Sequence, residues 1–288
     1  MSLRSGDVKR VLEARESARA PASAAAGGTG ECDLVYVLFE ESHQCPNAPL
    51  AEQLLDFAVA TCQPSPELAH CELLIPPSNK HESRVLFCTY LGTTSSWSED
   101  QKDNVYFYLK ETRNRWRAVP VFHPGAAAAV RAEADCEVGV SYSLARYLTA
   151  LRPLRWASWF LSTERRAPAH CATLAARVLG NAIGATAHNC NYYGPSSLYR
   201  ELSDRAAQVA PGLPTAPPNC ARAAEKLLRA PIVGSTVASM GDCACQEAVR
   251  ALTLQAVRDL ASADRAAQRT SQKRLADGLL RWVVLRES

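Results

Sequence analysis

Cys171 and His70 are the two residues of this chain whose types and settings best suit covalent chemistry. Cys171 follows the proline-containing loop 166–170 and precedes a run of strong helix formers, so the sequence places it in the first turn of a helix. The helix dipole and the unpaired N–H groups of that turn favour the thiolate and lower the thiol pKa. The same N–H groups can stabilise an oxyanion, which makes Cys171 a candidate nucleophile.

His70 is the candidate base, because a nucleophilic thiol needs a proton acceptor that is held in place. It opens the predicted strand 70–75, and the alternation of side chains along a strand puts His70 and Glu72 on the same face. His170 is a poorer partner for Cys171, because consecutive side chains diverge around a helix. We therefore assign His170 a loop or oxyanion role at most.

The elements that must position these residues predict an α+β fold. Strands are expected first and helices afterwards, which favours an antiparallel sheet. The predicted strands are 33–39, 70–75, 84–91, 105–110 and 115–122, with one helix at 49–62 between the first two. The later predicted helices are 141–148, 171–183, 196–208, 219–229, 243–262 and 265–285.

Three regions follow from the composition along the chain. Residues 1–30 are rich in Ala, Gly, Ser and Pro and are expected to form a disordered arm. Residues 31–205 hold the predicted sheet and the Cys-bearing helix. Residues 206–288 are expected to form a helical extension that packs on the main domain or on a protein partner.

The overall composition argues against several classes of protein. The 32 basic and 29 acidic residues are spread along the chain, so no nucleic-acid partner is expected. No apolar run is long enough to predict a transmembrane span, and no hydrophobic signal core follows the N-terminus. The odd count of 11 cysteines favours reduced thiols, and hence a soluble protein of a reducing compartment, the cytoplasm.

The His-led strand, His70-Cys-Glu-Leu-Leu-Ile75, and the Cys-led helix at 171 resemble the catalytic strand and helix of the NlpC-type papain-like superfamily. Because His70 precedes Cys171, the order resembles the circularly permuted members, such as the lecithin retinol acyltransferase group. Two further segments, 116–120 and 168–174, resemble permuted papain-like proteins of large DNA viruses. The resemblance covers residues 32–200 and implies a small sheet packed on the Cys-bearing helix; the viral likeness adds the virion as a location.

The resemblance implies a thiol hydrolase or acyltransferase that acts on an amide, ester or thioester. Its third catalytic position is a polar residue on the strand after the histidine, and Thr89 is the nearest candidate there. A weak third position favours an alternative, a papain-like fold that serves as a structural or interaction component, for instance of a virion. The substrate would be an acyl or peptide compound whose identity the residues do not specify.

Metal and redox cofactors have little support in the sequence. Cys243 and Cys245 form the closest cysteine pair, but on a helix their side chains would point about 200° apart. A zinc or redox protein is thus a third, weaker alternative, and no cofactor or metal is expected.

The aromatic cluster Trp156–Phe160 is expected in the core or the wall of a cleft. The segment 188–199 either rims a substrate cleft or covers the core.

Overall fold

The computed structural model describes residues 33–41, 67–77, 84–87, 95–96, 115–150, 152–214, 216–230 and 240–287. The predicted arm 1–30, the predicted helix 49–62 and the predicted strand 105–110 lie outside these ranges. Nothing in the structure therefore tests those three predictions.

The described strands form one sheet in the order β4-β3-β2-β1-β5, and each neighbouring pair is antiparallel. The central strand β1 carries the run Val35–Phe39, which is buried throughout because helices cover both faces of the sheet. The strands are β1 (Leu34–Glu41), β2 (Leu68–Ile75), β3 (Arg84–Phe87), β4 (Ser95–Ser96) and β5 (Trp116–Phe122).

Helices make up most of the described chain after β5, and the predicted α+β class is confirmed. The α-helices are α4 (Ala126–Glu137), α5 (Leu144–Ala150), α6 (Cys171–Ile183), α7 (Pro195–Val209), α8 (Pro218–Arg229), α9 (Asp242–Leu260) and α10 (Arg265–Glu287). Short 3-10 helices are η2 (Arg152–Phe160), η3 (Cys190–Tyr192) and η4 (Ala210–Gly212). Helix α4 was not predicted from the sequence.

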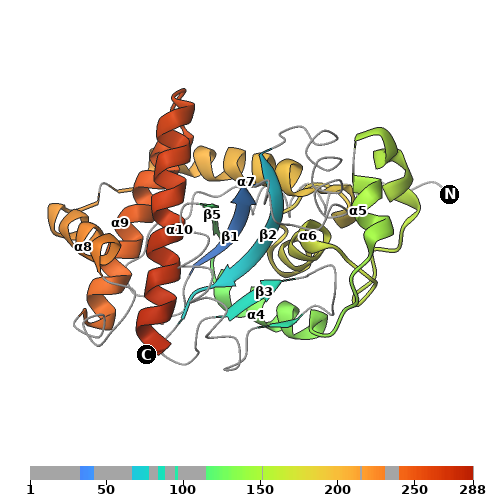
Figure 1. Ribbon diagram of the computed structural model, residues 1–288, viewed down its shortest axis with the longest axis horizontal. Helices are drawn as coiled ribbons and strands as arrows, with labels where there is room; N and C mark the ends of the chain where they lie inside the picture. The colour runs from blue at the N-terminus through green and yellow to red at the C-terminus, as the bar shows by residue number, and fades with distance from the viewer. Residues whose placement is uncertain are drawn as a thin grey trace, which may run out of the picture. The chain divides into compact units, whose positions relative to one another are not determined.

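The two faces of the sheet pack against different sets of helices (Figure 1). One face packs on α4, α6 and α7 through residues such as Val37, Leu73 and Leu174. The other face packs on α8, α9 and α10 through residues such as Leu38 and Leu279. The C-terminal helices thus supply the second cover of the sheet, and the Cys-bearing helix α6 belongs to the first.

A β-bulge interrupts the pairing of β1 with β2 close to His70. Glu40 pairs with His70 and Glu41 pairs with Leu68, so Ala69 is the extra residue. A bulge bends its strand and redirects the neighbouring side chains. The backbone at His70 therefore departs from regular strand geometry.

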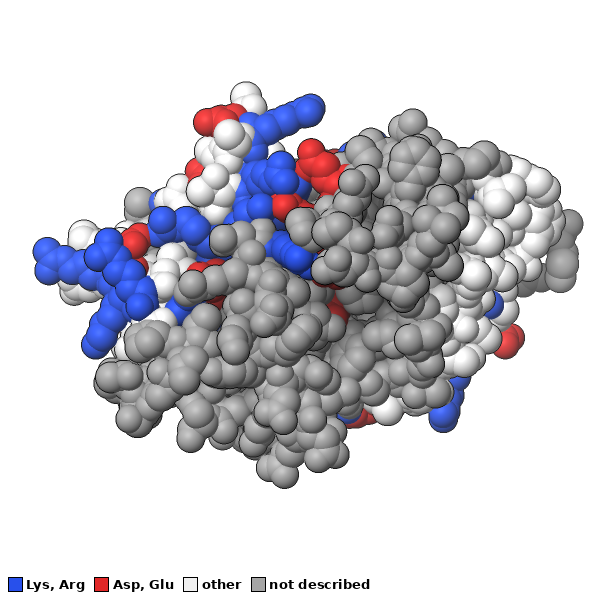
Figure 2. Space-filling view, in the orientation of Figure 1, with Lys and Arg blue, Asp and Glu red and all other residues white. Residues whose placement is uncertain are grey.

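Charged side chains of both signs gather over the C-terminal helices on the face shown in Figure 2. Arg274 of α10 pairs with Glu225 of α8, while Arg269 and Lys273 of α10 both bind Glu41 at the end of β1. These ion pairs attach the last helix to its neighbours. Within the described ranges, no helix has the length and apolar character needed to cross a bilayer.

Candidate functional site

Cys171 is the first residue of α6, as predicted. The first hydrogen bond within this helix runs from the Leu174 N–H to the His170 carbonyl at 2.9 Å. The His170 side chain makes no capping bond to the helix. The N–H groups of the first turn, from Cys171 to Thr173, therefore have no acceptor inside the helix and point toward the thiol end.

A buried ion pair fixes the orientation of α6. The Arg177 guanidinium donates from Nε to Glu137 Oε1 at 3.0 Å and from Nη2 to Glu137 Oε2 at 2.5 Å. Both side chains are buried. Glu137 also accepts from the Arg166 backbone N–H, at 3.4 Å to each oxygen. One carboxylate at the end of α4 thus holds both α6 and the loop that leads into it.

The residues just before Cys171 are fixed by a short parallel bridge between Tyr142 and Ala169. The Ser143 N–H donates to the Ala169 carbonyl at 2.9 Å, and the Ala169 N–H donates to the Ser141 carbonyl at 3.0 Å. This bridge leaves the chain little freedom at the point where it enters α6. The thiol therefore projects from a fixed backbone.

His70 lies on β2 beside the bulge, and Glu72 and Trp116 flank its ring. The distance from His70 Nε2 to Glu72 Oε1 is 3.5 Å, and the Glu72 side chain is buried. The indole of Trp116 lies edge-on to the imidazole, with 6.3 Å between ring centroids. The His70 side chain remains 23% exposed. A buried carboxylate and an aromatic wall thus orient a histidine that solvent still reaches.

The structure brings His70 and Cys171 into contact, and their pKa values move in opposite directions. Burial by itself would lower the pKa of His70, but the Cys171 sulfur and the Glu72 carboxylate raise it well above its ordinary value. Hydrogen bonding from Cys71 is the largest cause of a Cys171 pKa well below its ordinary value, with His70 and His170 adding to it against the effect of burial. Both shifts favour the thiolate form of Cys171 beside the imidazolium form of His70.

His170 and Cys71 complete the surroundings of the thiol. The His170 ring is fully buried, lies edge-on to Tyr147 with 5.3 Å between centroids, and helps to lower the Cys171 pKa. Cys71, the residue after His70, is also buried and hydrogen-bonds to Cys171. The sequence analysis assigned Cys71 no role and His170 a loop or oxyanion role at most, whereas both contact Cys171 in the structure.

Of the three residues named from the sequence, the structure brings two together. Cys171 and His70 are in contact, whereas Thr89 lies outside the described residues. Sequence reasoning did not assign a role to Glu72, although strand alternation already placed it on the same face as His70. That shared face is the signal that could have identified Glu72 as the partner of His70.

The segment 188–199 has a structural role at its centre. The Asn191 side chain is buried, accepts from Arg146 Nη1 at 2.6 Å and donates to the carbonyls of Leu161 and Ser162. It therefore fixes the end of η2. Other members of the segment, His188 among them, line a polar cavity of about 480 Å³ beside α7.

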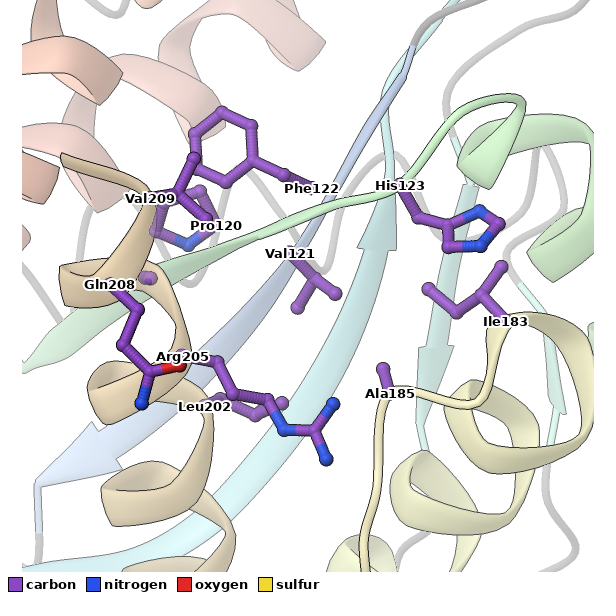
Figure 3. Close-up of a pocket in the computed structure, with 11 residues that line it drawn as sticks. Pro120, Val121, Phe122, His123, Ile183, Ala185, Leu202, Arg205, Gln208 and Val209 are labelled. Atoms are coloured by element: carbon purple, nitrogen blue, oxygen red, sulfur yellow. The ribbon is translucent and has the colours of Figure 1, made fainter. Parts of the chain in front are cut away.

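A second cavity, of about 280 Å³, lies between β5, the end of α6 and α7 (Figure 3). Its lining includes Val121, Ile183 and Leu202, with Arg205 at its side. Ile183 is the last residue of α6, so this end of the helix is about 18 Å from Cys171 along the axis. The cavity is therefore not the space into which the thiol projects.

Metal ligation receives no support from the described parts of the chain. No group of three or more His, Cys, Asp and Glu side chains lies within them in an arrangement that could hold an ion. Cys243 is exposed and Cys245 is buried, so the two thiols of the closest pair face different surroundings.

No known protein family matches this chain, and comparisons with curated proteins and with solved structures find no significant similarity.

Proposed function

We propose that this protein is a thiol hydrolase or acyltransferase in which Cys171 is the nucleophile and His70 the general acid and base. The observation that carries the proposal is the contact of these two side chains, with the pKa of the thiol lowered and that of the imidazole raised. Such a pair presents a thiolate at neutral pH, the form of cysteine that attacks a carbonyl. A cysteine with a purely structural role does not require the thiolate form.

The geometry supports a reaction in two halves. The Cys171 thiolate attacks an amide, ester or thioester carbonyl, and first-turn N–H groups of α6 stabilise the oxyanion. The His70 imidazolium gives its proton to the leaving group, which leaves an acyl group on sulfur. His70 then removes a proton from water, or from another acceptor, which attacks the acyl group and releases Cys171. Water gives hydrolysis, and another acceptor gives acyl transfer.

Glu72 is the orienting residue in this proposal, in place of Thr89. Its carboxylate contacts His70 Nε2 and favours the charged imidazole. The arrangement, with an antiparallel sheet, a His-bearing strand and a Cys-led helix, supports the permuted papain-like fold as the finer description of this α+β architecture. The substrate is an acyl or peptide compound, and the fold does not determine which one.

The enclosed position of Cys171 favours one other candidate function. Its exposed fraction is 5%, so the thiol lies behind other side chains. A papain-like fold retained as a structural or interaction component, for instance of a virion, would also enclose this residue. Under that alternative no acyl group would ever be found on Cys171.

The test is the rate at which iodoacetamide modifies Cys171 as a function of pH, read by peptide mass mapping. We expect fast modification well below pH 8 that is lost in His70→Ala, with exposed Cys136 as the reference thiol in each sample. A panel of ester, thioester and peptide substrates then follows, with Cys171→Ser as the control. Slow modification of Cys171 in both proteins, or hydrolysis that survives Cys171→Ser, would overturn the proposal.

A further inference from the structure

We propose that Cys71 and Cys171 form a reversible disulfide when the protein meets a hydroperoxide, which makes this thiol pair an oxidative modification site. The bond needs only the two thiols and the hydroperoxide that oxidises them. Its consequence, a nucleophile withdrawn from catalysis, rests on the proposed function above.

The two thiols come from different elements but share one environment. Cys71 lies on β2 and Cys171 begins α6, and the two side chains are in hydrogen-bonding contact within one hydrophobic cluster. Their exposed fractions are 1% and 5%. A disulfide requires two sulfurs that lie side by side, and the hydrogen bond between Cys71 and Cys171 brings these two together.

The roles of the two sulfurs follow from their surroundings. Cys171 is at a helix N-terminus and in contact with His70, so it carries the thiolate and is the sulfur that a peroxide oxidises. Cys71 donates its S–H to that thiolate. It is therefore placed to act as the resolving thiol, the one that attacks the oxidised sulfur of Cys171. Cys190 belongs to the same cluster, but its burial raises its pKa, so it is expected to stay a thiol.

The chemistry balances without any other reagent. The Cys171 thiolate attacks one peroxide oxygen, the O–O bond breaks, and a sulfenic acid forms while the His70 imidazolium protonates the departing alkoxide or hydroxide. The Cys71 sulfur then attacks the sulfenic sulfur, the S–O bond breaks, and water leaves with the Cys71 proton. In total the two thiols lose two electrons and the hydroperoxide gains them. An organic hydroperoxide yields an alcohol and one water, and hydrogen peroxide yields two waters.

The experiment treats the reduced full-length protein with an equivalent of hydrogen peroxide, blocks free thiols with iodoacetamide, and digests with trypsin together with a Glu-specific protease. The sequence then yields Leu68–Glu72, which contains Cys71 alone, and Ala167–Arg177, which contains Cys171 alone. We expect these two peptides linked by a disulfide that dithiothreitol cleaves. The linkage should disappear in Cys71→Ser and persist in Cys190→Ser.

The variant also reveals the fate of the nucleophile. Serine keeps a hydroxyl donor beside the thiolate, so Cys171 in Cys71→Ser should still react fast with iodoacetamide but proceed under peroxide to sulfinic and sulfonic acids that dithiothreitol does not reverse. Absence of the linked peptides in the wild type, or linkage of Cys171 to another cysteine, would overturn the inference. Linkage without acyl-transfer activity would instead count against the proposed function alone.

Discussion

At the scale of single residues, the candidate site includes one carboxylate to which the sequence analysis assigned no role. Glu72 contacts His70 Nε2 at 3.5 Å from two positions further along the same strand. In the proposed mechanism it is a positioning residue, since it would act through the imidazole and not on a substrate. Its negative charge contributes to the raised pKa of His70.

Replacing Glu72 by Gln should therefore weaken the ion pair without removing the histidine. The uncharged amide favours the imidazolium less, so the pKa of His70 falls and that of Cys171 rises toward its ordinary value. We expect alkylation of Cys171 at pH 5–6 to slow by about 3- to 10-fold and to recover near pH 9. Rate–pH profiles of the variant and the wild type test this expectation.

Glu247→Gln, a change of the same kind on the exposed side of α9, is the matched control. Its profile should coincide with that of the wild type. If Glu72→Gln also coincided with the wild type, Glu72 would have no part in holding the charge of His70.

The candidate pair could be predicted from the sequence because each member carries a local signal. A cysteine behind a proline loop and ahead of helix formers predicts a thiol at a helix start, and a histidine that leads an apolar run predicts a strand position. The contacts of Cys71 could not be predicted. Alternation sends Cys71 and His70 to opposite faces, yet both contact Cys171, and the bulge at Ala69 beside them has no signature in the sequence.

At the scale of elements, the buried pair of Arg177 and Glu137 decides where α6 lies. Taking two charges out of water is costly, and the bidentate geometry offsets that cost. The pair also couples α6 to α4, a helix that the sequence reasoning missed because the run of alanines in 126–129 shows no clear amphipathic pattern. The sequence alone therefore did not identify Arg177 and Glu137 as a buried ion pair.

Arg177→Met should destabilise the protein by about 3–5 kcal/mol, because it leaves the Glu137 carboxylate buried without its partner. The double variant with Glu137→Leu should lose less than the sum of the two single variants. Urea unfolding of the wild type, the two single variants and the double variant measures this coupling. Arg205→Met is the control: its pair with Glu201 is partly exposed, and we expect a loss of about 0–1 kcal/mol. Simple additivity of the two buried-site variants would contradict the argument.

The 3-10 helix η2 corrects another expectation. The tryptophans and the phenylalanine of Trp156–Phe160 were expected in the core or in a cleft wall, but Trp156, Trp159 and Phe160 are 67%, 65% and 82% exposed. Apolar type alone predicted burial here. Whether a side chain faces the core depends on how the short helix sits on α5, which composition does not determine.

Two tryptophans offer a direct comparison of these environments. Trp159→Ala removes an exposed side chain and should change the free energy of unfolding by less than about 1 kcal/mol. Trp282→Ala on α10 removes a buried ring from the second core and should cost about 3–5 kcal/mol. Urea unfolding of both variants checks the order. Equal losses would mean that η2 is packed more tightly than its exposure indicates.

At the scale of the whole molecule, Glu41 connects the sheet to the last helix. Arg117 of β5 donates to it at 2.6 Å, and Arg269 and Lys273 of α10 bind it at 2.8 Å. Burial by itself would raise the pKa of Glu41, but these hydrogen bonds outweigh it and lower the pKa to about 2. Ion pairs at the end of β1 thus hold α10, one of the helices that cover the second face of the sheet.

This lowered pKa makes stability depend on pH. The group ionises near 4.5 when unfolded and near 2 when folded, so its contribution is complete above pH 4.5 and is lost as the pH falls toward 2. Glu41→Gln should be less stable than the wild type by up to about 3 kcal/mol at pH 7, and the difference should shrink as the pH approaches 3. Urea unfolding at pH 7, 5, 4 and 3 measures it. A difference that stayed constant over this range would contradict the assignment.

The bulge at Ala69 also makes the length of β2 matter as much as its composition. Leu68 and Cys71 are three residues apart, yet both belong to the hydrophobic cluster on the α6 side, because the extra residue shifts the phase of the alternation. Loss of Ala69 through a one-codon deletion would remove the bulge and restore regular pairing, with Leu68 still opposite Glu41 and on the α6 side. Because that deletion would remove the bend beside His70, descendants of this gene should exchange the residue at position 69 freely but keep the number of residues between Leu68 and His70.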